Sequence, residues 1–272
     1  MRSLSRLKTA LMGGSVCAAL CALSTSAMAQ VNGLYGAEIL NGADPSTLTI
    51  TNTYNGVTGG ASVLDSQMTA TGTDRVDLLF SENGGASAAT FPVNQSFEIN
   101  ADVTLYGGFT SPRKEAGIRI NGTDGSLGND GLFILDTDAG EIVAFGGNAP
   151  FALFGNNGSG VNNTNGSGAP FVNGQTIYMA EVYNATAGTL TYYAQDLSTG
   201  GPLFSSGPNL AYTPPGPFQL GFYTQWSPSN PADSNFAQFT NISSVVPEPA
   251  SLSMLALGSV ALFVRRRAKS SV

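Results

Sequence analysis

Apolar and polar residues alternate strictly near the middle of the chain. Between Phe97 and Leu105 every odd-numbered position is apolar and every even-numbered position is polar. A period of two residues is typical of a β-strand that packs one face on a core and leaves the other in water. We therefore predict a strand at 97–105 with one solvated face.

A second pair of strands is predicted further along the chain. The segments 176–184 and 189–195 are rich in apolar and β-branched residues, and they are separated by four residues that end in Gly188. A short connection that contains glycine suits a β-hairpin. These two segments should therefore pair antiparallel.

Alternation returns from residue 218 onward. Phe218, Leu220 and Phe222 fall on one face of the expected strand, whereas Gln219 and Tyr223 fall on the other. Such a pattern suits the packing of two sheets in a sandwich. Weaker strand candidates lie at 47–52, 62–69, 74–80, 117–121, 132–136, 141–145 and 235–243. We expect about ten to fourteen strands in total.

The composition supports an all-β fold class. The chain has 34 glycines and only 11% charged residues, which favours short strands and tight turns over helices. We predict an antiparallel β-sandwich of the jelly-roll type, which leaves few strand edges open. The order of a long alternating strand, a glycine-rich region, a hairpin and a terminal strand at 236–242 resembles the concanavalin A-like lectin/glucanase fold. Glycine and asparagine dominate 155–170, where we expect a mobile loop.

The first 29 residues have the pattern of a signal peptide. Basic residues precede an apolar run at 10–23, and Ala27-Met28-Ala29 has the small-x-small pattern that signal peptidase cuts. The apolar run is too short for a stable transmembrane helix. We predict a signal helix at 1–29 that signal peptidase removes between Ala29 and Gln30.

Three features follow one another at the opposite end of the chain. Val246-Pro247-Glu248-Pro249 precedes an apolar run at 250–264, and Arg265-Arg266-Arg267 comes directly after that run. In this order they resemble the PEP-CTERM sorting signal. The resemblance implies a Gram-negative bacterium in which an exosortase-type membrane protease cuts near the Pro-Glu-Pro motif and delivers the protein to the cell surface or the extracellular matrix.

The length of the apolar run agrees with a transient anchor. Fifteen helical residues span about 22 Å, less than the roughly 30 Å hydrocarbon core of a bilayer. The short C-terminal hydrophobic helix would enter the inner membrane with its arginines on the cytoplasmic side. An uncleaved membrane anchor is the alternative. We divide the chain into a signal peptide at 1–29, a β-sandwich at 30–245 and a sorting segment at 246–272.

Charge and reactive residues narrow the function of the sandwich. Between residues 31 and 246 the 17 acidic and 4 basic side chains leave a net charge of −13, which repels nucleic acid. The chain has no histidine, and both cysteines lie in the signal peptide. Serine and cysteine nucleophiles therefore lack their partners, and only carboxylate catalysis remains. The basic residues of this region are Arg75, Arg113, Lys114 and Arg119.

Two sets of residues are candidates for binding. Tyr223 and Trp226 can stack on a sugar, although core packing explains Trp226 better. Asp136, Asp138 and Glu141 can supply oxygen ligands to calcium, although an ordinary hairpin turn explains them better. No cofactor other than calcium is suggested.

Two functions from different classes fit this pattern. The first is a non-catalytic surface or matrix protein whose sandwich has a structural, adhesive or polysaccharide-binding role. The alternative is a carboxylate-dependent glycosidase of the lectin/glucanase fold, which needs two carboxyl groups roughly 5–10 Å apart. The sequence contains no Glu-x-Asp-x-x-Glu run of the kind that such glucanases carry.

Overall fold

The structure is a computed structural model that describes residues 31–40, 47–66, 73–122, 131–138, 140–145, 151–154, 171–206, 210–214, 216–227 and 232–246. Residues Gln30–Val246 form one compact unit. The signal peptide with its cleavage site at Ala29 and Gln30, the 155–170 loop and the sorting segment from Pro247 onward lie outside the described residues.

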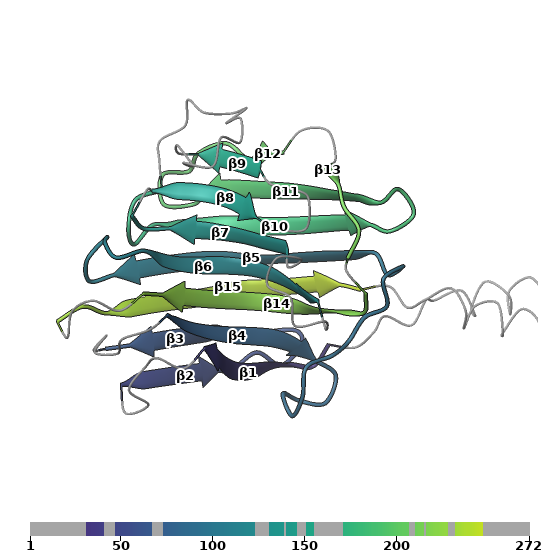
Figure 1. The fold of residues 1–272 in the computed structure, drawn as a ribbon, viewed down its shortest axis with the longest axis horizontal. Helices are drawn as coiled ribbons and strands as arrows, with labels where there is room; N and C mark the ends of the chain where they lie inside the picture. The colour runs from purple at the N-terminus through teal and green to yellow at the C-terminus, as the bar shows by residue number, and fades with distance from the viewer. Residues whose placement is uncertain are drawn as a thin grey trace, which may run out of the picture. The chain divides into compact units, whose positions relative to one another are not determined.

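A seven-stranded antiparallel sheet forms one layer of this unit (Figure 1). It runs in the order β1-β4-β14-β6-β7-β8-β9, so that strands from distant parts of the chain become neighbours. Its members are β1 (Gly33–Leu40), β4 (Asp74–Ser81), β6 (Lys114–Gly122), β7 (Gly131–Asp136), β8 (Glu141–Phe145), β9 (Phe151–Phe154) and β14 (Phe218–Trp226).

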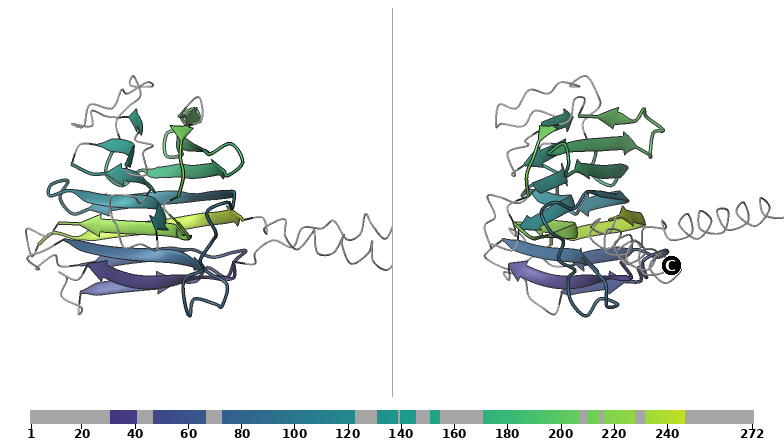
Figure 2. Two further views of the ribbon diagram at one scale, coloured as in Figure 1. Left: turned by 45° about the vertical axis from the view of Figure 1, so that its right-hand side comes forward. Right: turned by 90° about the vertical axis from the view of Figure 1, so that its right-hand side faces the viewer.

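An eight-stranded antiparallel sheet forms the second layer (Figure 2). Its order is β12-β11-β10-β5-β15-β3-β2, and β13 pairs with β11 beside this path. Its members are β2 (Leu48–Asn52), β3 (Ala61–Asp65), β5 (Phe97–Gly107), β10 (Thr176–Asn184), β11 (Thr189–Asp196), β12 (Phe204–Ser205), β13 (Leu210–Ala211) and β15 (Asn235–Val245).

The core lies between the inner faces of the two sheets. Along β5 each odd-numbered residue from Phe97 to Leu105 is buried, whereas the even-numbered residues are exposed or half-buried. Phe222 of β14 stacks on Phe239 of β15, with ring centroids 4.9 Å apart. Apolar burial of this kind is the main force that holds a sandwich without disulfides together.

A buried ion pair forms part of the inner face. The ammonium group of Lys114 lies 2.8 Å from a carboxylate oxygen of Asp233, and both side chains are fully buried. Its remaining donors bind the backbone carbonyls of Phe109 and Pro112 at 2.7 and 3.0 Å. The ion pair and the two hydrogen bonds offset the free-energy cost of burying the Lys114 ammonium group.

The predicted architecture is confirmed as an all-β antiparallel sandwich of two sheets. The strand expected at 97–105 is β5, and the expected hairpin is β10 and β11, which pair antiparallel. The described residues contain fifteen strands, more than expected, because β1, β9 and the two-residue strands β12 and β13 lack clear alternation. No helix within the described ranges is long and apolar enough to cross a membrane.

Candidate functional site

Five polar side chains form a row across the outer face of the seven-stranded sheet. Arg75 of β4 pairs in register with Gln225 of β14, which pairs with Glu115 of β6. Glu115 in turn pairs with Asp136 of β7, and Asp136 with Glu141 of β8. We call these five residues the charged row. Directly paired residues of an antiparallel sheet have Cβ atoms about 4.5–5.5 Å apart, so neighbours in the row are within reach of one another.

Arg113 links two carboxylates of the charged row. Its guanidinium lies 2.5 Å from a Glu115 oxygen and 2.8 Å from an Asp136 oxygen. The hydroxyl of Tyr223 donates a hydrogen bond to the other oxygen of Glu115. Both carboxylates are therefore engaged by protein groups, and the side chains of Glu115, Asp136 and Tyr223 are all buried.

Burial changes the acidity of the carboxyl groups in this part of the row. It raises the pKa of Asp136 to about 8, a hydrogen bond with Asp138 adds to the effect, and Arg113 opposes it. Burial also raises the pKa of Glu141, again against the influence of Arg113. A raised pKa is one property that a general acid requires.

A second ion pair crosses the same face. Arg119 of β6 pairs with Asp77 of β4, although β14 runs between these two strands. The residue of β14 opposite Arg119 is Gly221. A Cβ atom at Gly221 would lie 2.2 Å from the carbonyl oxygen of Leu78, so any larger residue would disturb the sheet as well as the path of the guanidinium.

Arg75 differs from the other two arginines of this face. Its Nε donates to the side-chain oxygen of Gln225 at 2.9 Å, and its Nη2 binds the same oxygen. Its guanidinium lies 5.5 Å from the ring centroid of Tyr223, within the range of a cation–π contact. Its Nη1 is buried without a hydrogen-bond partner, and no described carboxylate forms an ion pair with it.

The predicted binding residues fall in different environments. Tyr223 lies on the outer face but is 0% exposed, and Trp226 is 1% exposed on the inner face, where its indole donates to Asp65 at 3.1 Å. Neither ring is open to a sugar, so the structure favours the packing interpretation of Trp226. Asp136 and Glu141 are in the charged row, whereas Asp138 is exposed in the turn that follows β7.

Calcium binding at the β7–β8 turn stays a prediction. Among the residues that the structure describes, no group of three Asp, Glu, His or Cys side chains is arranged to hold a metal ion. The Asp136 carboxylate already has Arg113 as a partner. Asp138 contributes a backbone N–H that donates to Asp136 at 3.0 Å, as expected of an ordinary Asp turn.

Sequence reasoning missed the arginines and their partners. Arg75, Asp77, Glu115 and Arg119 occupy alternate positions of β4 and β6, between apolar residues that point into the core. One sequence signal could have indicated this site, because this part of the chain, residues 31–246, contains only four basic side chains. All three of its arginines, Arg113 included, gather on one sheet face.

The outer face of the eight-stranded sheet carries a different and uncharged row. Thr51 of β2, Ser62 of β3, Gln238 of β15, Thr104 of β5 and Thr176 of β10 are paired in register across five strands. We call this set the hydroxyl row. The hydroxyl oxygens of Thr104 and Thr176 are 2.8 Å apart. None of these side chains is fully buried, so the row is open to solvent.

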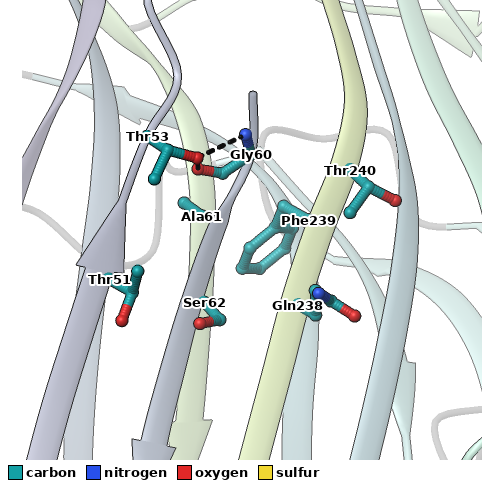
Figure 3. Close-up of a pocket in the computed structure, with 8 residues that line it drawn as sticks. All are labelled: Thr51, Thr53, Gly60, Ala61, Ser62, Gln238, Phe239 and Thr240. Atoms are coloured by element: carbon teal, nitrogen blue, oxygen red, sulfur yellow. Dashed lines mark hydrogen bonds between the residues drawn. The ribbon is translucent and has the colours of Figure 1, made fainter. Parts of the chain in front are cut away.

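An open pocket lies at the β2 end of the hydroxyl row (Figure 3). Its volume is about 190 Å³. Thr53 holds one wall in place, since its hydroxyl donates to the carbonyl of Gly60 at 3.1 Å and accepts from the N–H of Gly60 at 3.2 Å. The pocket is lined by Thr51, Thr53, Gly60, Ala61, Ser62, Gln238, Phe239 and Thr240.

A model of the PEP-CTERM protein-sorting motif matches residues 245–267. The chain carries a PEP-CTERM sorting motif. The match covers Pro247, Glu248 and Pro249 together with the arginine cluster, so the predicted resemblance is confirmed at the residues that suggested it. The PEP-CTERM motif indicates an exported protein that exosortase sorts. A search of curated proteins found no match.

Several solved structures are similar to the sandwich as a whole. The catalytic domain of the glycoside hydrolase family 131 protein from Coprinopsis cinerea is 13% identical, with a TM-score of 0.43 over 79% of this chain and 83% of that one. Alginate lyase AlgAT5 from polysaccharide lyase family 7 is 12% identical, with a TM-score of 0.41 over 80% and 96%. Lectin II from Ulex europaeus is 12% identical, with a TM-score of 0.39 over 77% and 97%. These neighbours have concanavalin A-like folds, and at this similarity they indicate no ligand and no reaction.

Proposed function

We propose that this exported protein is a non-catalytic component of the cell surface or matrix that binds neutral polysaccharide on the outer face of its eight-stranded sheet. The observation that carries the proposal is the hydroxyl row. It offers hydrogen-bonding side chains on five successive strands, and adjacent strands are about 4.8 Å apart. An extended polymer of sugar hydroxyls can therefore meet a matching series of partners.

An aromatic side chain beside the row supports this assignment. Tyr106 is two residues from Thr104 on β5, pairs in register with Phe236 of β15 and is 48% exposed. Exposed rings next to hydroxyl and amide groups suit sugars, which have both apolar faces and polar edges. The pocket of about 190 Å³ is smaller than the roughly 300–1,000 Å³ of typical small-molecule sites, so it suits one unit of a longer chain.

Charge favours a neutral polymer at this face. None of the strands of the eight-stranded sheet contains lysine or arginine, and Glu98 and Asp102 lie on its outer face. Carboxylates in the ligand would be repelled there. Neutral hydroxyls need no counter-charge.

The test is binding of the full-length chain, held in mild detergent, to soluble dextran and xylan by isothermal titration calorimetry. Tyr106→Ala and Gln238→Ala should each weaken binding by roughly 5–30-fold, because each removes a stacking surface or a hydrogen bond. Phe109→Ala is the matched control, since Phe109 is 47% exposed but lies beyond the end of β5. Equal affinity for all four proteins, or no binding to either polymer, would reject the proposal.

A carboxylate-dependent glycosidase is the second candidate, because three carboxyl groups lie on successive strands in the charged row. Asp136 has its pKa raised to about 8, and Glu115 is its direct neighbour on β6. Directly paired residues have Cβ atoms about 4.5–5.5 Å apart, a spacing compatible with the roughly 5–5.5 Å between the two carboxyl groups of a retaining enzyme. Engagement of both groups by Arg113 supports the non-catalytic alternative.

Release of reducing ends from dextran, xylan or polygalacturonate would decide between the two. Catalysis would be lost by at least about 100-fold in both Glu115→Gln and Asp136→Asn, whereas Asp138→Asn would retain it. Absence of turnover by the wild-type chain on all three polymers would leave the binding function alone.

A further inference from the structure

Arg75 is a buried cation that has no anionic partner among the residues that the structure describes. Arg75 is 6% exposed, and its guanidinium contacts no described carboxylate. Removing a guanidinium from water is costly unless a counter-charge and hydrogen bonds replace the solvent. Arg113 and Arg119 on the same face both meet this requirement with acidic partners.

The neighbouring acidic groups are already committed elsewhere. Asp77 lies two residues along β4 on the same face and pairs with Arg119. Glu115 lies one strand beyond Gln225 and is held by Arg113 and Tyr223. The contacts of Arg75 are therefore a neutral amide and an aromatic ring, which position the guanidinium without neutralising it.

Two hydrogen-bond donors remain at this point of the charged row. One is Nη1 of Arg75, which is buried and has no partner. The other is the side-chain NH₂ of Gln225, since the oxygen of that amide accepts both bonds from Arg75 and the NH₂ donates to no described residue. Two donors on adjacent strands match the two oxygens of a carboxylate.

We propose that Arg75 and Gln225 form a binding site for a single carboxylate group, as carried by an acidic sugar. One unpaired positive charge matches a monoanion. A dianion such as phosphate would keep an uncompensated charge beside the nearby carboxylates. This site lies on the opposite sheet from the hydroxyl row, so it is independent of the neutral-polysaccharide function proposed above.

Calorimetric titration of the full-length chain with galacturonate, oligogalacturonate and galactose tests the site. Galactose has a hydroxymethyl group where galacturonate has its carboxylate, and it should not bind. Arg75→Gln should weaken galacturonate binding by roughly 10–100-fold, the usual effect of losing a charge-assisted hydrogen bond. Tighter binding of oligogalacturonate would assign the site to a polymer, and equal affinity per carboxylate would assign it to a free acid.

Gln225→Glu is the decisive variant, because it supplies the missing counter-ion from within the protein. We expect it to abolish galacturonate binding and to raise the melting temperature of the ligand-free chain. Gln219→Glu is the matched control, since it adds the same charge to the outer face of the same strand, opposite Asn121 and away from Arg75. It should change the affinity by less than about 3-fold, because it acts only through screened, longer-range repulsion.

Two outcomes would overturn the proposal. One is galacturonate affinity that is unchanged in both Arg75→Gln and Gln225→Glu. The other is an equal loss of affinity in Gln225→Glu and Gln219→Glu, which would indicate general repulsion instead of a site at Arg75. Neither outcome depends on dextran binding. The carboxylate site at Arg75 and neutral-polysaccharide binding at the hydroxyl row can therefore be rejected independently of each other.

Discussion

At the scale of single residues, Glu181 is a carboxyl group inside the sandwich. It lies on β10, opposite Ile99 of β5 and Tyr192 of β11, and is fully buried. Neither of its oxygens has a hydrogen-bond partner, and burial raises its pKa well above the usual value. Burial therefore favours the neutral form of Glu181 in the folded protein.

This state of Glu181 makes folding depend on pH. Between the unfolded pKa of about 4.3 and the raised folded pKa, the folded chain keeps a proton that the unfolded chain loses, so stability falls as the pH rises through that range, by up to about 1.4 kcal/mol per pH unit. Asp136 acts in the same direction until its folded pKa of about 8 is passed. Glu181→Gln should reduce the slope of unfolding free energy against pH by one proton, as measured by urea unfolding between about pH 5 and pH 8.

Asp138→Asn serves as the comparison, because Asp138 is exposed in a turn and should leave that slope nearly unchanged. A Glu181→Gln protein with the same slope as the wild type would show that Glu181 is ionised in the folded state.

A second prediction at this scale concerns Lys114. Lys114→Met leaves the Asp233 carboxylate buried without its cation and should cost about 3–5 kcal/mol of unfolding free energy. The double variant Lys114→Met/Asp233→Asn should cost less than the sum of the two single changes, because it removes both charges. Additive losses in urea unfolding would contradict the pairing.

At the scale of elements, the sequence predicted individual strands better than their partners. The alternation at 97–105 and the hairpin at 176–195 identify β5, β10 and β11, since period and turn chemistry are local signals. The charged row depends instead on register between distant strands. Arg75 and Gln225 are 150 residues apart, and nothing local to either indicates that β4 pairs with β14.

The close approach of β6 and β7 gives a prediction for one glycine. A Cβ atom at Gly117 would lie 2.0 Å from the carbonyl oxygen of Phe133, so Gly117→Ala must push the two strands apart. We expect a loss of at least about 2 kcal/mol in urea unfolding. Gly36→Ala on β1 is the matched control, because its Cβ would meet only methyl groups at 3.5 Å, and it should change stability by less than about 1 kcal/mol.

At the scale of the whole molecule, we expect the two ends of the chain to direct export and sorting and the sandwich to provide the binding surface. The PEP-CTERM motif is confirmed at 245–267, whereas both cleavage sites stay predictions. Mass spectrometry of the surface-located protein should find an N-terminus at Gln30 and a C-terminus upstream of Arg265. Mature protein at the surface that still ends at Val272 would support the uncleaved anchor instead.

The four basic residues at 31–246 lie in β4, in β6 or directly before β6, and none lies in a strand of the eight-stranded sheet. The strands of the eight-stranded sheet therefore carry acidic side chains and no basic ones, whereas the strands of the seven-stranded sheet carry both. Next to an anionic bacterial envelope, the sheet without cations is the more strongly repelled. We expect the protein at the cell surface to turn the hydroxyl row toward the medium, where incoming polymers meet it first.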